Sequence, residues 1–382
     1  MKRVVFFLFS LFFFCFSVYA EEFDITGEYV SLYNMNEDML IYSKNDTKKT
    51  SIASLTKMMT TLVAIENIDD LEKVITIKER DFDGTVGYSK AGFSVGDKVT
   101  YLDLLYGIIL PSGADAVNAI VNNTLGYNSF IKKMNETAKK IGMNDTSFAN
   151  PIGKDDENNY STSSDIAKLL KYALKNETFK KVFTTKSYKT SNGINLESTV
   201  NSYKSILNTS EILGAKSGFT KNAGRCLASI TTLNGVDYLL VVINSSTSSP
   251  SNAVKDTITI YDYYSSNYGY KNILNDDTFI KEIPVDLSKE KTYKITGNED
   301  VNKYLKNGDE VTYEYVGSDK ITFNTKKGSK LGVVNIYNGD ELIATSNVEY
   351  YPIVTYVLIF IGVIFILLII RKSKKKHRRR RR

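Results

Sequence analysis

Near the carboxyl end of this 382-residue chain, residues 353–370 form a run of 18 uncharged, mostly apolar side chains. A run of this length is long enough to cross the hydrocarbon core of a membrane as one helix. Ten lysine and arginine residues follow it, and a cationic cluster beside a span is retained on the cytoplasmic side. The pattern predicts a transmembrane anchor over residues 352–370 and a basic cytoplasmic tail over residues 371–382.

The amino-terminal end predicts export. Residues 1–20 begin with Lys2 and Arg3, continue through an apolar run and end in Val18-Tyr19-Ala20. This arrangement is typical of a secretory signal peptide with a small residue at its cleavage site. We expect a mature chain that starts at Glu21, with its main domain outside the cytoplasm, held at the cell membrane by a single pass.

The composition of the exported part excludes several kinds of site. Acidic residues outnumber basic ones there by 43 to 37, which gives no support to nucleic-acid binding. The single histidine, His377, lies in the predicted tail, so a Ser-His-Asp triad and a histidine-ligated zinc site are excluded. Only Cys226 remains after removal of the signal peptide, so no intramolecular disulfide is possible. A hydroxyl nucleophile would need another base, for which lysine is the obvious candidate, and we expect neither a metal nor a cofactor.

Residues 21–272 alternate between strand and helix patterns. Strand signals at both ends of a helical middle predict an α/β domain with an antiparallel sheet. We expect a strand hairpin over residues 31–42, helices from about residue 54 and over 102–110, 114–123, 128–141, 164–176 and 254–264, and strands over 226–232 and 238–244.

The pattern changes at about residue 275. Short alternating segments separated by turn residues predict a small all-β domain over residues 273–350. The turn Asn338-Gly339-Asp340 is a strong hairpin signal. Strands are expected over residues 278–285, 292–295, 310–316, 321–325, 332–337 and 341–348.

A serine and a lysine three residues apart begin the stretch ASLTKMMTTLVAIEN, residues 53–67. Its apolar residues recur with helical spacing, so Ser54 would lie in the first turn and Lys57 on the same face. Two readings are open: Ser54 is a nucleophile with Lys57 as its base, or Ser54 is only a helix N-cap. The same spacing occurs at Ser129/Lys132 on a mid-domain helix, at Ser288/Lys291 in a turn of the β domain and at Ser373/Lys376 in the tail, and we discard these three pairs.

Two further stretches complete a pattern. Ser112 lies between two expected helices, beside Pro111 and Gly113, where a side chain can point into a cleft. Lys216-Ser217-Gly218 begins an expected strand hairpin. Because Gly218 has no side chain, a substrate backbone could approach that strand closely and pair with its edge.

The three motifs, S-x-x-K, a serine at Ser112 and K-S-G, stand in the order typical of penicillin-recognising serine enzymes. Over roughly residues 25–270 the chain resembles the D-alanyl-D-alanine carboxypeptidases, the low-molecular-mass penicillin-binding proteins. Blocks such as YLDLLYGIILPSGADA, FIKKMNETAKKIGMNDTSFANPIG and GAKSGFTKNAGRCLAS resemble that family in the family's order. The resemblance implies the penicillin-binding, β-lactamase-like transpeptidase fold, followed by the small β domain and the anchor.

The resemblance also implies a reaction. The enzyme would remove the terminal D-alanine from peptidoglycan stem peptides ending in D-Ala-D-Ala, and β-lactam antibiotics would acylate the same serine. Ser54 would attack and Lys57 would take its proton. Ser112 would relay a proton to the leaving amine, Lys216 and Ser217 would hold the terminal carboxylate beside Gly218, and the N–H groups of Ser54 and Phe219 would form the oxyanion hole.

Some residues depart from the family pattern. Ala114 stands where the family usually has an asparagine, and Asn118, one helical turn on, is a candidate replacement. The arginine that often follows the strand ending at Asn244 is absent, and Lys255 is the nearest cation in sequence. Three other readings stay open: a β-lactamase, a D,D-endopeptidase of the same fold, and a catalytically weak envelope scaffold.

Overall fold

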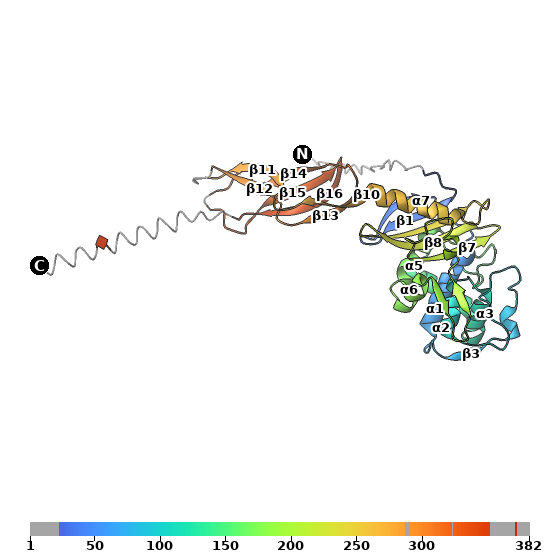
Figure 1. Cartoon of the computed structure of the whole chain (residues 1–382). Coiled ribbons are helices and arrows are strands. Elements are labelled where there is room, and N and C mark those ends of the chain that lie inside the picture. The colour runs from blue at the N-terminus through green and yellow to red at the C-terminus, as the bar shows by residue number, and fades with distance from the viewer. Residues whose placement is uncertain (1–22, 287–290, 323, 352–370, 373–382) are drawn as a thin grey trace, which may run out of the picture. The chain divides into compact units, whose positions relative to one another are not determined.

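The structure is a computed structural model that describes residues 23–286, 291–322, 324–351 and 371–372 (Figure 1). It divides into two compact units, residues 1–267 and 268–382, which are described separately. The predicted signal peptide, the predicted anchor, the tail beyond residue 372 and Ser288 lie outside the described residues. Within those described ranges, no helix is both long enough and apolar enough to cross a membrane.

The first unit is built on a five-stranded antiparallel sheet with the order β2-β1-β9-β8-β7. Residues 238–243 of its central strand are all buried, as expected for a strand covered on both faces. Asn234 and Gly235 both have positive φ and join β8 to β9 in a tight hairpin. The strands are β1 (Tyr29–Asn34), β2 (Met39–Lys44), β7 (Gly214–Thr220), β8 (Gly224–Leu233) and β9 (Val236–Ser245).

The two faces of β8 pack against different partners. Cys226 and Ala228 belong to the large core shared with the helical region. Leu227 lies between them and packs instead with Ala253 and Val254 of α7 (Asn252–Asn267), because successive side chains of a strand point to opposite faces. Helix α7 therefore covers one face of the sheet, and α5 with the other helices covers the other (Figure 1).

Helix α1 (Thr56–Asn67) lies at the centre of the helical region. Residues 56–64 are all buried, and the helix contacts five other helices, as expected for a helix enclosed by a core. The other elements are α2 (Tyr101–Ile109), α3 (Ala114–Asn123), α4 (Tyr127–Ile141), α5 (Ser163–Ala173), α6 (Glu177–Thr184), the 3₁₀ turns η1 (Ala53–Leu55), η2 (Glu79–Phe82) and η3 (Asn201–Tyr203), and the short strands β3 (Val74–Thr76), β4 (Lys98–Thr100), β5 (Ser187–Lys189) and β6 (Asn195–Glu197).

Helix α6 is not predicted by the sequence pattern. The helix expected over residues 164–176 ends at Ala173, and a second helix begins directly after Asn176. The side chain of Asn176 accepts a hydrogen bond of 3.0 Å from the backbone N–H of Phe179, so it acts as the N-cap of α6. Asn176, which was expected to end the helix over residues 164–176, therefore caps the start of α6.

The second unit contains three small antiparallel sheets, with the orders β10-β13, β11-β12 and β14-β15-β16. Together with the first unit, it confirms the expected class of an α/β domain followed by a β domain. The predicted hairpin between residues 338 and 341 joins β15 to β16. The strands are β10 (Tyr268–Leu274), β11 (Phe279–Pro284), β12 (Thr292–Thr296), β13 (Val301–Lys306), β14 (Val311–Gly317), β15 (Lys330–Asn338) and β16 (Glu341–Glu349).

Three details of the second unit differ from the sequence-based expectation. The strand predicted over residues 321–325 is wrong: Ile321 forms only an isolated bridge with Val285, and the backbone N–H of Thr325 bonds to the carbonyl of Thr322 in a turn. Strands β10 and β13 were not predicted, because lysine, asparagine and glycine interrupt their apolar alternation.

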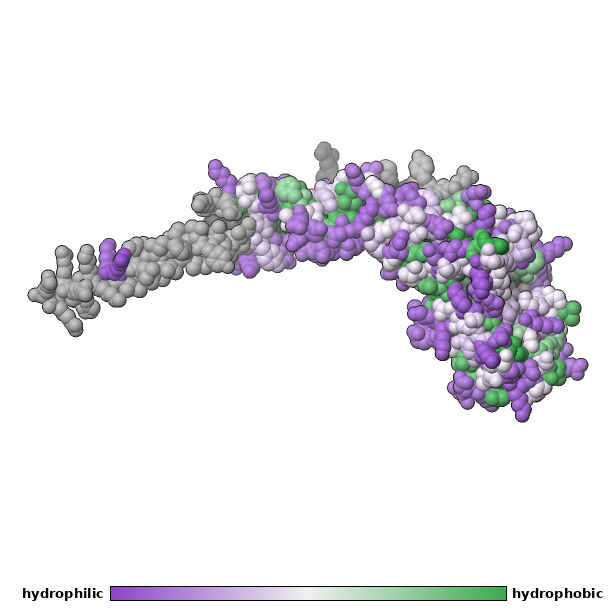
Figure 2. Space-filling model, viewed as in Figure 1, coloured by the Kyte–Doolittle hydropathy of each residue, from purple (hydrophilic) through white to green (hydrophobic). Residues whose placement is uncertain are grey.

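Exposed large apolar side chains occur at separate positions in loops and strands, for example Val86, Ile206 and Phe279. On the visible face of the molecule, hydrophilic residues surround the hydrophobic ones (Figure 2). Single apolar residues on a surface are normal, so the position of each one, and not its exposure alone, decides whether it has a function.

Candidate active site

The turn before α1 places Ser54 beside the loop that contains Gly153 and beside strand β7. Ala53 has a φ of +46°, a left-handed conformation that costs a non-glycine residue about 1–3 kcal/mol. Gly153 packs directly against it: a Cβ atom at Gly153 would lie 2.0 Å from the carbonyl oxygen of Ala53. The glycine is required here by this close approach and by its own φ of +82°.

Lys57 lies one turn after Ser54 with its side chain buried in the core. Its Nζ is 2.8 Å from Oγ of Ser54 and donates a hydrogen bond of 2.7 Å to the carbonyl oxygen of Ile152. The turn that presents this carbonyl is held by Asn150, whose Oδ1 accepts bonds of 2.8 Å from the N–H groups of Gly153 and Lys154.

The reading of Ser54 as only an N-cap is wrong. The residue that precedes α1 is Leu55, and no side chain caps that helix end by a hydrogen bond. The η1 turn likewise begins after Ile52, without a side-chain cap. The Ser54 hydroxyl is therefore directed to the lysine amine and not to the helix backbone.

Burial changes the protonation of Lys57. Loss of solvation lowers the pKa of its amine from the ordinary 10.5 to about 7, although the carboxylate of Asp115 raises it. Asp115 is itself buried, and its Oδ2 has no hydrogen-bond partner among the described residues. A substantial fraction of Lys57 is therefore unprotonated near pH 7.

Ser112 lies between α2 and α3 with a φ of +66° and is almost fully buried. Two hydrogen bonds fix the turn around it from the preceding loop. The N–H of Ala114 donates to the carbonyl of Ser89 at 2.8 Å, and the N–H of Ala91 donates to Oδ1 of Asp115 at 2.7 Å. The surrounding segments thus support an unfavourable backbone conformation at Ser112.

Lys216 joins Ser112 to strand β7. Its fully buried Nζ donates to Oγ of Ser112 at 2.9 Å and to the carbonyl of Ser217 at 2.7 Å. Burial and the nearby charge of Lys57 together lower the pKa of Lys216 far below its ordinary value. Two serine–lysine pairs therefore form one buried polar cluster.

Strand β7 borders this cluster and lies at the edge of the sheet. A Cβ atom at Gly218 would lie 3.0 Å from the backbone nitrogen of Ser54, so the glycine allows this close approach. The side chain of Phe219 is half exposed. An edge strand has one row of free backbone N–H and C=O groups, to which an extended peptide can add.

The structure adds residues that no sequence motif indicated. The hydroxyls of Ser217 and Thr199 lie 2.6 Å apart. The guanidinium of Arg225, on β8, lies 4.0 Å from the ring centre of Phe219. Only the pairing of Phe219 with Arg225 in the hairpin could have indicated this arginine.

Asn118 does not replace the missing asparagine. Its amide donates to the backbone carbonyls of Asp81 and Asp83, at 3.2 and 2.9 Å. Both of its N–H hydrogens are thereby used to hold the η2 region against α3. Ala114 itself is completely buried, so its position carries no polar side chain, and Lys255 is an exposed residue of α7.

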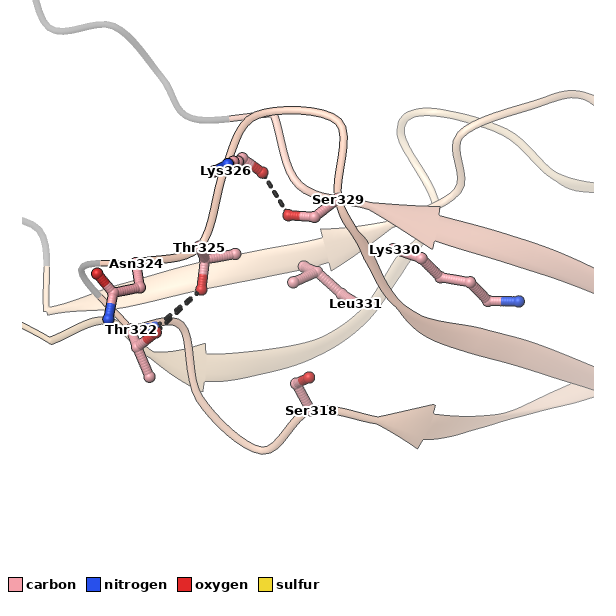
Figure 3. A pocket seen from close by; sticks show the side chains of 8 residues that line it. All are labelled: Ser318, Thr322, Asn324, Thr325, Lys326, Ser329, Lys330 and Leu331. Carbon is pink, nitrogen blue, oxygen red and sulfur yellow. Dashed lines mark hydrogen bonds between the residues drawn. The ribbon is translucent and has the colours of Figure 1, made fainter.

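Other features of the described residues do not compete with this site. They contain no group of three or more His, Cys, Asp or Glu side chains that could hold a metal. A pocket of about 370 Å³ in the second unit is lined by hydroxyls, amides and two lysines (Figure 3). The hydroxyls of Thr322 and Thr325 bond to each other there, and the hydroxyl of Ser329 donates to the backbone carbonyl of Lys326. No side-chain amine in this lining is hydrogen-bonded to a hydroxyl group.

Known proteins are similar to this chain in sequence. A family model for D-alanyl-D-alanine carboxypeptidase matches residues 17–247. The D-alanyl-D-alanine carboxypeptidase DacF of Bacillus subtilis is 29% identical over 316 residues, 81% of this chain and 81% of the relative. The D-alanyl-D-alanine carboxypeptidase of Streptomyces sp. strain K15 is 33% identical over 227 residues, 55% of this chain and 78% of the relative.

The fold is shared with a solved structure. Penicillin binding protein 5 of Haemophilus influenzae aligns with a TM-score of 0.63 and 22% identity, covering 86% of this chain and 97% of that one. The first unit therefore has the penicillin-binding transpeptidase fold, and a β-sheet domain follows it.

The contact between Gly153 and Ala53 gives a first prediction. Gly153→Ala adds a Cβ where the Ala53 carbonyl lies, so thermal unfolding should show a loss of more than the ~1–3 kcal/mol expected from backbone strain alone. The folded fraction should also react more slowly with a fluorescent penicillin, because Ser54 is displaced.

The matched control is Gly193→Ala, which has a φ of +91° and open space around it. It should lose stability through strain but keep the wild-type labelling rate. Equal behaviour of the two variants would show that Gly153 does not position Ser54.

Proposed function

Because this chain belongs to the D-alanyl-D-alanine carboxypeptidase family, and is thus a penicillin-binding serine carboxypeptidase of peptidoglycan metabolism, we propose that Ser54 is its nucleophile and Lys57 its general base. The observation that carries this assignment is the 2.8 Å contact between Ser54 Oγ and Lys57 Nζ. The base is buried, and its pKa is lowered to about 7. A base with a pKa near the working pH combines availability with basicity.

In the proposed acylation step, unprotonated Lys57 takes the hydroxyl proton of Ser54. The Ser54 oxygen then attacks the carbonyl carbon between the two terminal D-alanines. The N–H groups of Ser54 and Phe219 would stabilise the oxyanion, an interaction for which one donor typically contributes about 3–4 kcal/mol. When the C–N bond breaks, the leaving amine receives a proton through Ser112, free D-alanine departs, and an ester of Ser54 remains.

Lys216 has two roles in this step. Lys216 bonds to Ser112, so it orients the hydroxyl that would deliver the proton to the leaving amine. With Ser217, it would also line the place of the substrate's terminal carboxylate. Water then hydrolyses the ester and releases the shortened peptide, whereas a β-lactam would leave a slowly hydrolysed adduct on Ser54.

The cellular location and the substrate are also part of the proposal. The signal-like residues 1–20 and the apolar run at 353–370 favour a single-pass protein of the cell membrane with its catalytic domain outside the cytoplasm. Stem pentapeptides ending in D-Ala-D-Ala would be the substrates. The buried serine–lysine pairs disfavour the reading as a catalytically weak scaffold.

The direct test is Ser54→Ala in the full chain. The variant should fold normally, release no D-alanine from a peptide ending in D-Ala-D-Ala and take up no fluorescent penicillin, because the attacking oxygen is gone. Ser129→Ala is the matched control, since Ser129 has the same spacing to a lysine but is exposed on α4; it should keep both activities. Stoichiometric labelling of the Ser54 variant would refute the nucleophile.

The buried base gives a prediction about pH. Only unprotonated Lys57 can accept the Ser54 proton, so the second-order rate constant of penicillin acylation should rise with pH, with a midpoint near the pKa of about 7. The Asp115 carboxylate raises that pKa, so Asp115→Asn should move the midpoint to lower pH while retaining an oxygen to accept the N–H of Ala91.

Asp165→Asn serves as the control, because Asp165 is a buried carboxylate on α5 that does not act on Lys57. Its midpoint should match that of the wild type. An Asp115→Asn midpoint that stays in place or moves upward would contradict the electrostatic role of Asp115.

A further inference from the structure

Lys216 would line the place of the substrate's terminal carboxylate, but a buried lysine is poorly suited to supply the full positive charge that a carboxylate needs. Burial lowers the pKa of both Lys57 and Lys216, so keeping their positive charges is costly. Arginine, in contrast, stays protonated in proteins. In the described part of the first unit the two arginines are Arg80 and Arg225, and Arg80 bonds to the carbonyl of Asn122 near η2.

Arg225 lies beside the strand that borders the nucleophile. In the β7–β8 ladder it is paired with Phe219, and cross-strand partners have their side chains on the same face. Its guanidinium stacks on the Phe219 ring at 4.0 Å. Because side chains alternate along a strand, Ser217 is on this same face, two residues from Phe219.

The distance between these positions suits a long side chain. Diagonal neighbours on one face of an antiparallel pair lie roughly 7–8 Å apart, within reach of an extended arginine. The hydroxyls of Ser217 and Thr199 are already in contact at 2.6 Å. Two hydroxyls and a planar guanidinium fork together match the several acceptor sites of a carboxylate.

The guanidinium of Arg225 is not committed to a protein acceptor. Its Nε is buried without a hydrogen-bond partner, and within the described ranges no carboxylate forms a salt bridge with it. Asp155, in the loop after Gly153, accepts instead from the tip of this hairpin, from Thr220 Oγ1 at 2.6 Å and from the N–H of Asn222. A buried donor without an acceptor is costly, so an oxygen ligand placed beside it would be favourable.

We propose that Arg225, together with the hydroxyls of Ser217 and Thr199, binds the terminal α-carboxylate of the peptide that Ser54 attacks. This assignment rests on the proposed roles of Ser54 and β7. It makes Arg225 a substrate-binding residue that selects peptides with a free carboxyl end, as a carboxypeptidase requires. It also supplies the cation that the segment after Asn244 lacks.

The test compares two substrates that differ only in this charge: a peptide ending in D-Ala-D-Ala and the same peptide ending in D-alaninamide. In the full chain, Arg225→Gln should lower kcat/KM for the acid roughly 10- to 100-fold, the loss typical of a removed charge-assisted hydrogen bond. The amide should be nearly unaffected, so the preference for the acid should collapse.

Two further variants sharpen the result. Arg225→Lys keeps the charge but loses the two-pronged geometry. Its preference for the acid over the amide should therefore fall between those of the wild type and Arg225→Gln. If the glutamine variant does not fold, the lysine variant provides the test. Arg80→Gln removes the other arginine and should leave the kcat/KM of both substrates unchanged.

Equal losses for acid and amide would overturn the proposal and assign Arg225 to the support of Phe219. An unchanged acid rate would overturn it as well. If the wild type releases no D-alanine, the proposed function fails separately. The comparison is then made by measuring acylation of Ser54 with a penicillin and with its methyl ester. A loss of the preference for the penicillin in Arg225→Gln supports the role of Arg225, and equal losses for the penicillin and its ester refute it.

Discussion

The burial of two lysine amines is the constraint on which the rest of the site depends. An amine removed from water must have its polar hydrogens satisfied. Lys57 reaches Ser54 and the Ile152 carbonyl, and Lys216 reaches Ser112 and the Ser217 carbonyl. Two of these partners are the serine hydroxyls to which we assign reacting roles, and the other two are backbone carbonyls. The hydrogen bonds that make the burial tolerable therefore also build the proposed catalytic arrangement.

Two strained backbone positions lie at the same place. Ala53 and Ser112 both have positive φ without being glycine, at a typical cost of about 1–3 kcal/mol each. The protein maintains these conformations by packing. Gly153 lies against the carbonyl of Ala53, and the Ser89 carbonyl holds the turn after Ser112 through the N–H of Ala114. Both serines also contact the edge strand β7, Ser54 through the close approach of Gly218 and Ser112 through the amine of Lys216.

The sequence predicted what is local and missed what depends on register. Helical spacing correctly placed Ser54 and Lys57 near the start of a buried helix, and apolar alternation located most strands. The contact between Ser112 and Lys216 joins residues 104 positions apart; only the ordered motifs suggested it, because no periodicity encodes such a distance. The Phe219–Arg225 pair follows from strand pairing, and the Thr199–Ser217 contact follows from a turn that lies beside β7; no local pattern determines either one. The end of α5 and the turn at residues 321–325 were misread because polar residues served as caps and turns there.

Ala114 shows how such a site can lose one polar group. The geometry of the Ser112 turn rests on the backbone N–H of Ala114 and on the Asp115 carboxylate, so it does not need a side-chain amide at residue 114. What the alanine removes is a possible hydrogen bond to the substrate. The edge of β7 offers free backbone groups, and Arg225 offers a permanent charge on the neighbouring strand. Recognition of the peptide would then depend more on the strand and on its charged end than on the loop that carries Ser112.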